Sequence, residues 1–181
     1  MTTTTSIHRA VLAFGSNVGQ RLESLQSAMD ALTDTPGVEP LSISPVYETK
    51  PFGGPAGSAD EMDLSDQDDY LNAVAVIGTD LTPQQLLIRT QAIEQALNRV
   101  RGERWAPRTI DVDIIVYDDL QLHEDELTVP HLRAHERPFV LRPWHDVDPD
   151  AVIPGRGSIA ELLEQLPGDS VELRPDLELQ W

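Results

Sequence analysis

Apolar and polar residues alternate along the chain in patterns that predict strands and helices in turn. The apolar run 9–14 is typical of a buried strand. Over 18–32, apolar residues recur every three or four positions, which predicts an amphipathic helix capped by Ser16 or Asn17. Pro36 and the glycine after it should end this helix.

Two further strands and a second helix follow. Strand character returns over 38–49 and again over 70–77. The second helix has a clear start signal, with Thr82 at the N-cap, Pro83 at the first helical position and Gln85 three residues after the cap. We therefore expect a helix from Pro83 to about residue 100.

The segment 109–117 alternates strictly and predicts a strand with one apolar and one acidic face. Four apolar side chains should share one face, and two carboxylates should share the other. The apolar residues are Ile110, Val112, Ile114 and Val116, and the acidic ones are Asp111 and Asp113.

This order of elements is β-α-β-β-α-β, the ferredoxin-like plan of an α+β protein. An antiparallel sheet should carry both helices on one face and leave the other face for a ligand or for C-terminal additions. Those additions include a predicted helix at 159–166. We expect a flexible N-terminal tail over 1–8 and a single catalytic domain over 9–181. The acidic segment 53–69 lacks apolar periodicity and predicts a mobile loop.

Composition limits the classes of function. The formal net charge is −18, so long-range repulsion opposes binding to nucleic acid or to an anionic membrane. There is no cysteine, and therefore neither a disulfide framework nor a thiolate metal site. No apolar run reaches the roughly 18 residues of a membrane span, and the first residues do not read as a signal peptide. We expect a cytoplasmic monomer.

Against this acidic background, one short segment gathers cations beside a pair of carboxylates. Four arginines fall within ten residues, and Asp111 and Asp113 follow directly. Arginine matches phosphate oxygens bidentately, and paired carboxylates hold Mg²⁺, which bridges phosphates. The pattern indicates a nucleotide triphosphate site, although surface ion pairs or a solvated strand face are simpler readings of each part. The arginines are Arg99, Arg101, Arg104 and Arg108.

Several motifs, taken in order, resemble one enzyme family. They are Phe14-Gly-Ser-Asn17, Tyr47-Glu-Thr49, Tyr70-Leu-Asn-Ala73, Arg104-Trp-Ala-Pro-Arg-Thr-Ile-Asp-Val-Asp113 and Leu127-Thr-Val-Pro-His131. The chain resembles the 6-hydroxymethyl-7,8-dihydropterin pyrophosphokinases of folate biosynthesis over about residues 9–150. The resemblance implies a similar fold and the transfer of pyrophosphate from ATP, as co-substrate, to the hydroxymethyl group of the dihydropterin, releasing AMP.

The resemblance also implies roles for individual residues. Asp111 and Asp113 match metal ligands that hold two Mg²⁺ ions. Three arginines match catalytic groups, two of them, Arg101 and Arg108, on a closing loop, and four further positions match ATP contacts or backbone beside adenine. The catalytic arginines are Arg99, Arg101 and Arg108; the ATP set adds Gln91, Ile114, His131 and Arg137 to Arg101 and Arg108.

For the pterin, the resemblance implies a ring held between Tyr70 and Phe139 and an edge hydrogen-bonded to Asn72. Further contacts are implied at Thr49, Phe52 and Trp105. Tyr70 and Asn72 lie two residues apart on one strand and so share a face, as a common pocket requires. Taken alone, Phe139 would be read as a core residue, and Trp105 as either core or lid.

Two other classes of protein remain open on the sequence. A different Mg²⁺-dependent nucleotide transferase would need no pterin-reading amide and should tolerate loss of Asn72. A non-enzymatic sensor on the same fold would leave the arginines and the aspartate pair without a role.

Overall fold

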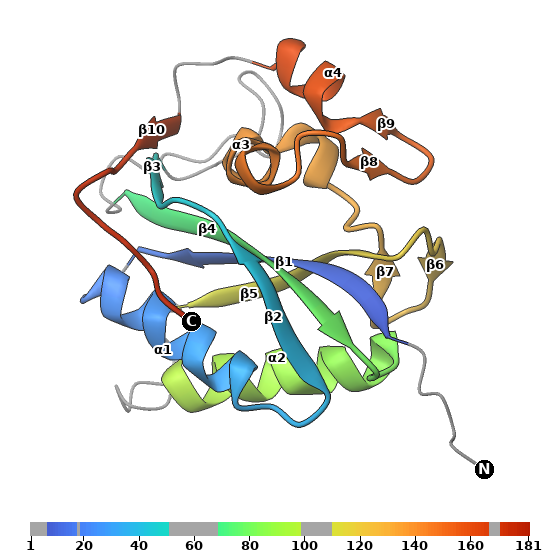
Figure 1. The fold of residues 1–181 in the computed structure, drawn as a ribbon, viewed down its shortest axis with the longest axis horizontal. Coiled ribbons are helices and arrows are strands. Elements are labelled where there is room, and N and C mark those ends of the chain that lie inside the picture. Colours follow the sequence, from blue (N-terminus) through green and yellow to red (C-terminus); the bar gives the residue numbers. More distant parts are fainter. Residues whose placement is uncertain (1–6, 18, 51–68, 99–109, 167–170) are drawn as a thin grey trace.

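The computed structural model describes residues 7–17, 19–50, 69–98, 110–166 and 171–181. Its main sheet is built from strands of the first two thirds of the chain together with one C-terminal strand, and two small hairpins are added (Figure 1). The elements are β1 His8–Ser16, α1 Arg21–Thr33, β2 Val38–Ile43, β3 Tyr47–Thr49, β4 Tyr70–Thr79, α2 Pro83–Asn98, β5 Asp111–Tyr117, β6 Leu122–His123, β7 Thr128–Val129, a 3-10 turn Ala134–Glu136, α3 Pro138–Val147, β8 Val152–Ile153, β9 Gly157–Ser158, α4 Ile159–Glu164 and β10 Val171–Leu173.

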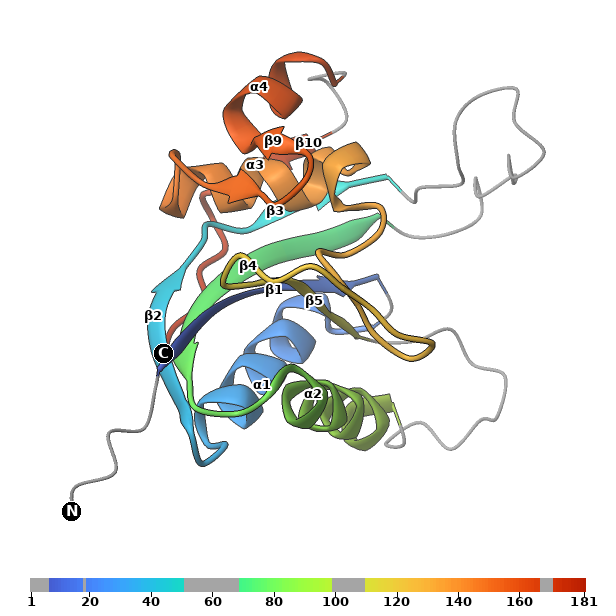
Figure 2. The same ribbon diagram turned by 90° about the vertical axis from the view of Figure 1, so that its right-hand side faces the viewer.

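The predicted ferredoxin-like plan is confirmed. The strand order is β10-β3-β4-β1-β5, with β2 also paired to β4, and every pairing is antiparallel. Helices α1 and α2 cover one face of the sheet, and α3 and α4 lie over the other (Figures 1 and 2). Each face has its own hydrophobic cluster, so the additions after β5 form a packed second layer.

The second helix begins as predicted. The backbone N–H of Gln85 donates to the Thr82 hydroxyl at 3.1 Å, and the Thr82 N–H donates to the Gln85 side chain at 2.9 Å. This reciprocal pair is a capping box, which satisfies two backbone donors at the helix start.

The first helix begins later than predicted, so the cap at Ser16 or Asn17 is wrong. Ser16 is the last residue of β1 and is fully buried, and helix α1 starts at Arg21 with Gln20 at its N-cap. Between them the chain turns at Gly19, whose φ of 71° lies in the left-handed region that glycine tolerates.

The predicted strand over 38–49 is two strands. β2 and β3 both pair with β4, and Ser44 and Pro45 lie between them. Proline has no N–H to donate to the ladder. Ser44 bridges the gap, because its N–H donates to the carbonyl of Val74 and its hydroxyl accepts from the N–H of Val74, both at 2.8 Å.

A β-bulge corrects the predicted alternation of β5. Val11 pairs with Val116 and Leu12 pairs with Ile114, so Ile115 is an extra residue opposite the β1 ladder. Val116 therefore leaves the face of Ile114 and joins Ile115 in the cluster beneath α3. The bulge lies after Asp113 and leaves the predicted acidic face of β5 unchanged.

At the N-terminus, the predicted tail over 1–8 is one residue too long, because His8 is the first residue of β1. The predicted C-terminal helix at 159–166 is found as α4, and a further helix, α3, precedes it. The predicted mobile loop lies outside the described residues except for Asp69. Within the described parts of the chain, no helix is long and apolar enough to cross a membrane.

Candidate active site

The sheet face beneath α3 brings the candidate metal and pterin residues together. Gly15 on β1 pairs with Asn72 on one side and with Asp111 on the other. Paired residues of antiparallel strands point to the same face. Asn72 and Asp111 are thus two interstrand spacings apart, about 9–10 Å. Thr49 pairs with Tyr70 and extends the same face by one strand.

Gly15 leaves room for side chains of the neighbouring strand β4 to approach the sheet. A Cβ atom at this position would lie 3.3 Å from Oδ1 of Asn72 and 3.6 Å from a ring carbon of Tyr70. The first distance is tighter than an ordinary contact, so a side chain here would displace the Asn72 amide. Glycine at this position therefore lets the Asn72 amide keep its place.

The Asn72 amide is held by Thr49. Its Nδ2 donates to the Thr49 hydroxyl at 2.8 Å, and both side chains are buried. An amide carries two N–H donors and one oxygen acceptor. One N–H is used here, and among the described residues the other N–H and the oxygen remain to read the edge of a ligand.

The two carboxylates leave the sheet beside different partners. Burial raises the pKa of the Tyr70 phenol, and the negative charge of Asp111 raises it further. Asp113 lies 3.8 Å from the guanidinium of Arg137, and its side chain is 41% exposed. The structure therefore leaves Asp113 accessible and places a cation beside it.

Arg137 and His131 lie together on the Asp113 side of the site. The N–H of His131 donates to the carbonyl of Ile115 at 2.8 Å, which fixes the segment after β7 against β5. Burial lowers the pKa of His131, partly offset by Asp113, and so favours the neutral ring. Burial also lowers the pKa of Arg137, although Asp113 opposes this shift.

The guanidinium of Arg137 also lies over the ring of Phe139, 5.6 Å from its centroid. This distance is within the range of a cation–π contact. Nε of Arg137 is buried without a hydrogen-bond partner in the described structure. Phe139 is half-buried in the first turn of α3 and Tyr70 is half-buried at the start of β4, on the same side of the sheet.

Two predicted ATP residues are not brought into this group. Gln91 is exposed on α2, in the helix layer on the other side of the sheet. The side chain of Ile114 is buried in the cluster against α1 and α2, so it can offer a ligand only its backbone. The remaining predicted site residues lie outside the described residues: Arg99, Arg101, Arg104, Arg108, Phe52 and Trp105.

The sequence reasoning missed residues that position the site. Tyr47 is buried opposite Asn72, and its hydroxyl hydrogen-bonds the carboxylate of Asp146 near the end of α3. Glu94 on α2 accepts the N–H of Val112 at 2.8 Å, which supports the strand of the aspartate pair. Tyr47 lies in the same motif as Thr49, so alternation along that motif would have placed it on the site face.

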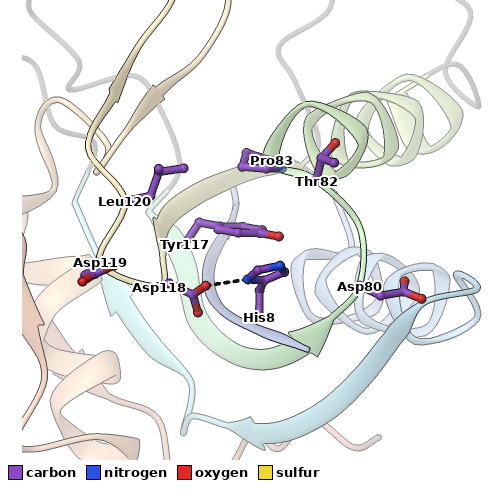
Figure 3. A pocket seen from close by; sticks show the side chains of 8 residues that line it. All are labelled: His8, Asp80, Thr82, Pro83, Tyr117, Asp118, Asp119 and Leu120. Atoms are coloured by element: carbon purple, nitrogen blue, oxygen red, sulfur yellow. Dashed lines mark hydrogen bonds and ion pairs between the residues drawn. The ribbon is translucent and has the colours of Figure 1, made fainter. Parts of the chain in front are cut away.

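A separate pocket of about 300 Å³ lies at the other end of β1, between the start of α2 and the end of β5 (Figure 3). The rings of His8 and Tyr117 lie 5.0 Å apart in it, and His8 Nδ1 is 2.6 Å from Asp118. Figure 3 shows the carboxylates of Asp80 and Asp119 directed away from this ring pair. The acidic rim is unsuited to a triphosphate, so we do not assign the nucleotide to it.

Comparison with known proteins agrees with the geometry. The family model for 7,8-dihydro-6-hydroxymethylpterin-pyrophosphokinase matches residues 11–149. The chain is 40% identical to the 2-amino-4-hydroxy-6-hydroxymethyldihydropteridine pyrophosphokinase of Methylorubrum extorquens, over 91% of this chain and 97% of that protein. It is also 40% identical to the Mycobacterium tuberculosis protein of the same name, over 94% of this chain and 93% of that protein.

Among solved structures, the chain is similar to Plasmodium falciparum HPPK-DHPS crystallised with pteroate, with a TM-score of 0.68 and 14% sequence identity. The match covers 88% of this chain and 44% of that one, so the chain spans less than half of the solved protein. At this identity the likeness supports the fold alone, whereas the family model and the sequence relatives cover most of the chain. The chain therefore belongs to the 7,8-dihydro-6-hydroxymethylpterin pyrophosphokinase family.

Proposed function

We propose that the chain transfers the pyrophosphoryl group of ATP to the hydroxymethyl group of 6-hydroxymethyl-7,8-dihydropterin and releases AMP, as a step of folate biosynthesis. The observation that carries the proposal is the shared face on which the Asn72 amide and the Asp111 carboxylate flank Gly15. This face would hold the pterin edge beside the metal that binds the triphosphate. Family membership supports the same reaction.

The described residues suit a pterin. A flat heteroaromatic ring is well held between aromatic faces, and Tyr70 and Phe139 offer two half-buried rings on one side of the sheet. The amide of Asn72 offers a donor and an acceptor to the 2-amino-4-oxo edge. Thr49 holds that amide, and we assign further pterin contacts to Phe52 and Trp105.

The residues on the other side of Gly15 suit a metal-bound triphosphate. Among the described residues, no group of three or more His, Asp or Glu side chains forms a closed metal cage. Asp111 and Asp113 would hold Mg²⁺, two ions by the pattern of the family, and its charge would offset that of the triphosphate. Mg²⁺ commonly binds through one or two carboxylates, with water and substrate phosphates completing its shell.

We assign nucleotide binding to Arg137 and His131. The Arg137 guanidinium lies beside Asp113, and its buried Nε has no hydrogen-bond partner among the described residues, so an anion could supply one. Gln91 and the backbone of Ile114 would contact ATP at β5, the edge strand of the main sheet. We assign the role of catalytic arginines, which would bind the phosphates, to Arg99, Arg101 and Arg108.

In the transfer itself, the pterin hydroxymethyl oxygen loses its proton to solvent and forms a bond to the β-phosphorus. The bond from that phosphorus to the oxygen shared with the α-phosphate breaks, and AMP leaves with that oxygen. The protein must hold the two substrates in line and disperse the charge. The rings of Tyr70 and Phe139 and the Asn72 amide would orient the alcohol, while Arg137 and the loop arginines would stabilise the developing charge.

For the rest of the molecule, we propose one catalytic domain over 9–181, a monomer in the cytoplasm. Its substrates would be small molecules rather than nucleic acid or membrane. The net charge of −18 supports this choice, because it opposes binding to polyanions.

The direct test is to incubate the purified chain with ATP, Mg²⁺ and 6-hydroxymethyl-7,8-dihydropterin and to separate the nucleotide products. We expect AMP and the pyrophosphorylated pterin in equal amounts. Formation of ADP would indicate a different phosphotransferase, and no consumption of ATP would contradict the proposal. An Asn72→Ala variant serves as the control, because a nucleotide transferase that does not use pterin would tolerate it.

A further inference from the structure

The C-terminal segment 171–181 runs from β10, at the outer edge of the sheet, to helix α1 (Figure 1). It lies beyond the residues that the family model matches. At one end β10 pairs with β3, placing Val171 opposite Thr49 and Leu173 opposite Tyr47. The three-residue strand β3 is thus held on both sides, by β4 and by β10.

Directly after β10, a cluster of ion pairs also binds strand β3. Oε2 of Glu48 accepts from Arg174 at 3.2 Å and from Arg21 at 2.6 Å. The Arg174 guanidinium also binds Asp176 at 2.8 Å. Arg21 in turn donates to the carbonyl of Asp69 at 2.8 Å, directly before Tyr70. The cluster joins the C-terminal segment to β3 and to the start of β4.

The distal end of the segment is anchored in the core. Leu179 is only 5% exposed and packs in the cluster between the sheet and the first two helices. The backbone of Gln180 exchanges two hydrogen bonds with the side chain of Gln26 on α1, at 2.7 and 3.0 Å. The segment is therefore fastened at both ends.

We propose that residues 171–181 act as a strap that positions the pterin-reading amide, with Arg174 as a positioning residue. The chain of contacts runs from Arg174 to Glu48 on β3, to its neighbour Thr49, and through the Thr49 hydroxyl to the Asn72 amide. The described contacts of the strap are with β3 at one end and α1 at the other, so its effect is directed at the pterin half of the site. The inference rests on the proposed function.

The test compares single variants with the unaltered chain. Arg174→Gln loosens the strap beside β3, and Leu179→Ala loosens it at its distant anchor. The matched control is Arg9→Gln, since Arg9 is an exposed arginine whose ion pair, 3.0 Å to Asp148, lies away from β3. Calorimetry measures binding of hydroxymethyl dihydropterin in the presence of Mg²⁺ and a non-hydrolysable ATP analogue, and binding of the analogue alone.

We expect each strap variant to weaken pterin binding by about two- to fivefold, with binding of the analogue unchanged. For Arg174→Gln this is the scale of a surface ion pair. Arg174→Lys, which keeps the charge near Glu48, should recover part of the loss. The control should bind both ligands normally. Unchanged pterin binding in both strap variants, or an equal loss for pterin and analogue, would overturn the proposal.

A second measurement is independent of the reaction. Amide hydrogen exchange in the unliganded chain should be faster across β3 in Arg174→Gln than in the unaltered chain, and unchanged in Arg9→Gln. Equal protection of β3 in Arg174→Gln and in the unaltered chain would also refute the strap. If the unaltered chain neither binds the pterin nor forms AMP while exchange changes as expected, the proposed function fails and the mechanical link remains.

Discussion

Replacing Thr49 by valine would test how the pterin-reading amide is held. The substitution keeps the branched shape of the side chain but removes the hydroxyl that accepts from Nδ2 of Asn72 at 2.8 Å. Asn72 and Thr49 are only 4% and 5% exposed, so water cannot readily replace the lost acceptor. The amide N–H is left buried and unsatisfied.

The expected loss follows from these contacts. An unsatisfied buried polar group costs about 1–3 kcal/mol, so the free energy of unfolding should fall by that amount. Binding of the pterin must then also order the Asn72 amide, because Thr49 no longer orients it. One hydrogen bond contributes about 1 kcal/mol net, which corresponds to an affinity about fivefold weaker. Nucleotide affinity should be unchanged.

Urea denaturation gives the stability change, and calorimetry with a non-hydrolysable ATP analogue gives the pterin affinity. Thr79→Val is the matched control, because Thr79 is buried on the same strand as Asn72 and its hydroxyl donates to the carbonyl of Gly37 at 2.7 Å. This control should lose stability and keep its affinity for pterin. If Thr49→Val loses stability but binds pterin as before, the amide does not depend on Thr49.

Three further predictions concern the metal pair, the loop and the tyrosines. Asp111→Asn or Asp113→Asn should lower AMP formation by several orders of magnitude while circular dichroism stays unchanged; near-normal turnover would remove the metal assignment. Arg101→Ala and Arg108→Ala should depress single-turnover rates more than pterin affinity, and exchange across 101–108 should slow when both substrates are bound; protection that is already high without ligands would contradict a closing loop. Burial raises the pKa of all three tyrosines above the ordinary value of 10.0. The folded chain then retains protons that the unfolded chain releases, so stability should fall as pH rises above 10.0, and ultraviolet absorbance should show tyrosinate forming together with unfolding. Full ionisation of the folded chain near pH 10.0 would refute this.

The parts of the fold that depend on local periodicity could be predicted from the sequence. The capping box at Thr82 and Gln85 is local, and so is the acidic face of Asp111 and Asp113, because side chains alternate along any regular strand. The shared face of Tyr70 and Asn72 follows from the same rule.

The incorrect predictions depended on contacts between distant segments. Whether Ile115 bulges is decided by its pairing with β1, which spacing within β5 does not reveal. Ser16 resembles a helix cap in sequence, but pairing with Leu71 draws it into the sheet. The hold of Thr49 on Asn72 spans 23 residues, so only the assembled sheet brings these side chains together.

The bulge at Ile115 has a consequence for how the chain tolerates changes in length. Deleting this one residue would leave a continuous ladder, because Ile114 and Val116 already pair with adjacent residues of β1. The carboxylates would keep their orientation, yet the Ile115 carbonyl that accepts the His131 N–H would be gone, as would a fully buried side chain beneath α3. A shorter strand could thus be more regular and still lose its attachment to the segment that carries His131 and Arg137. The irregularity in β5 is what joins the two layers at this edge.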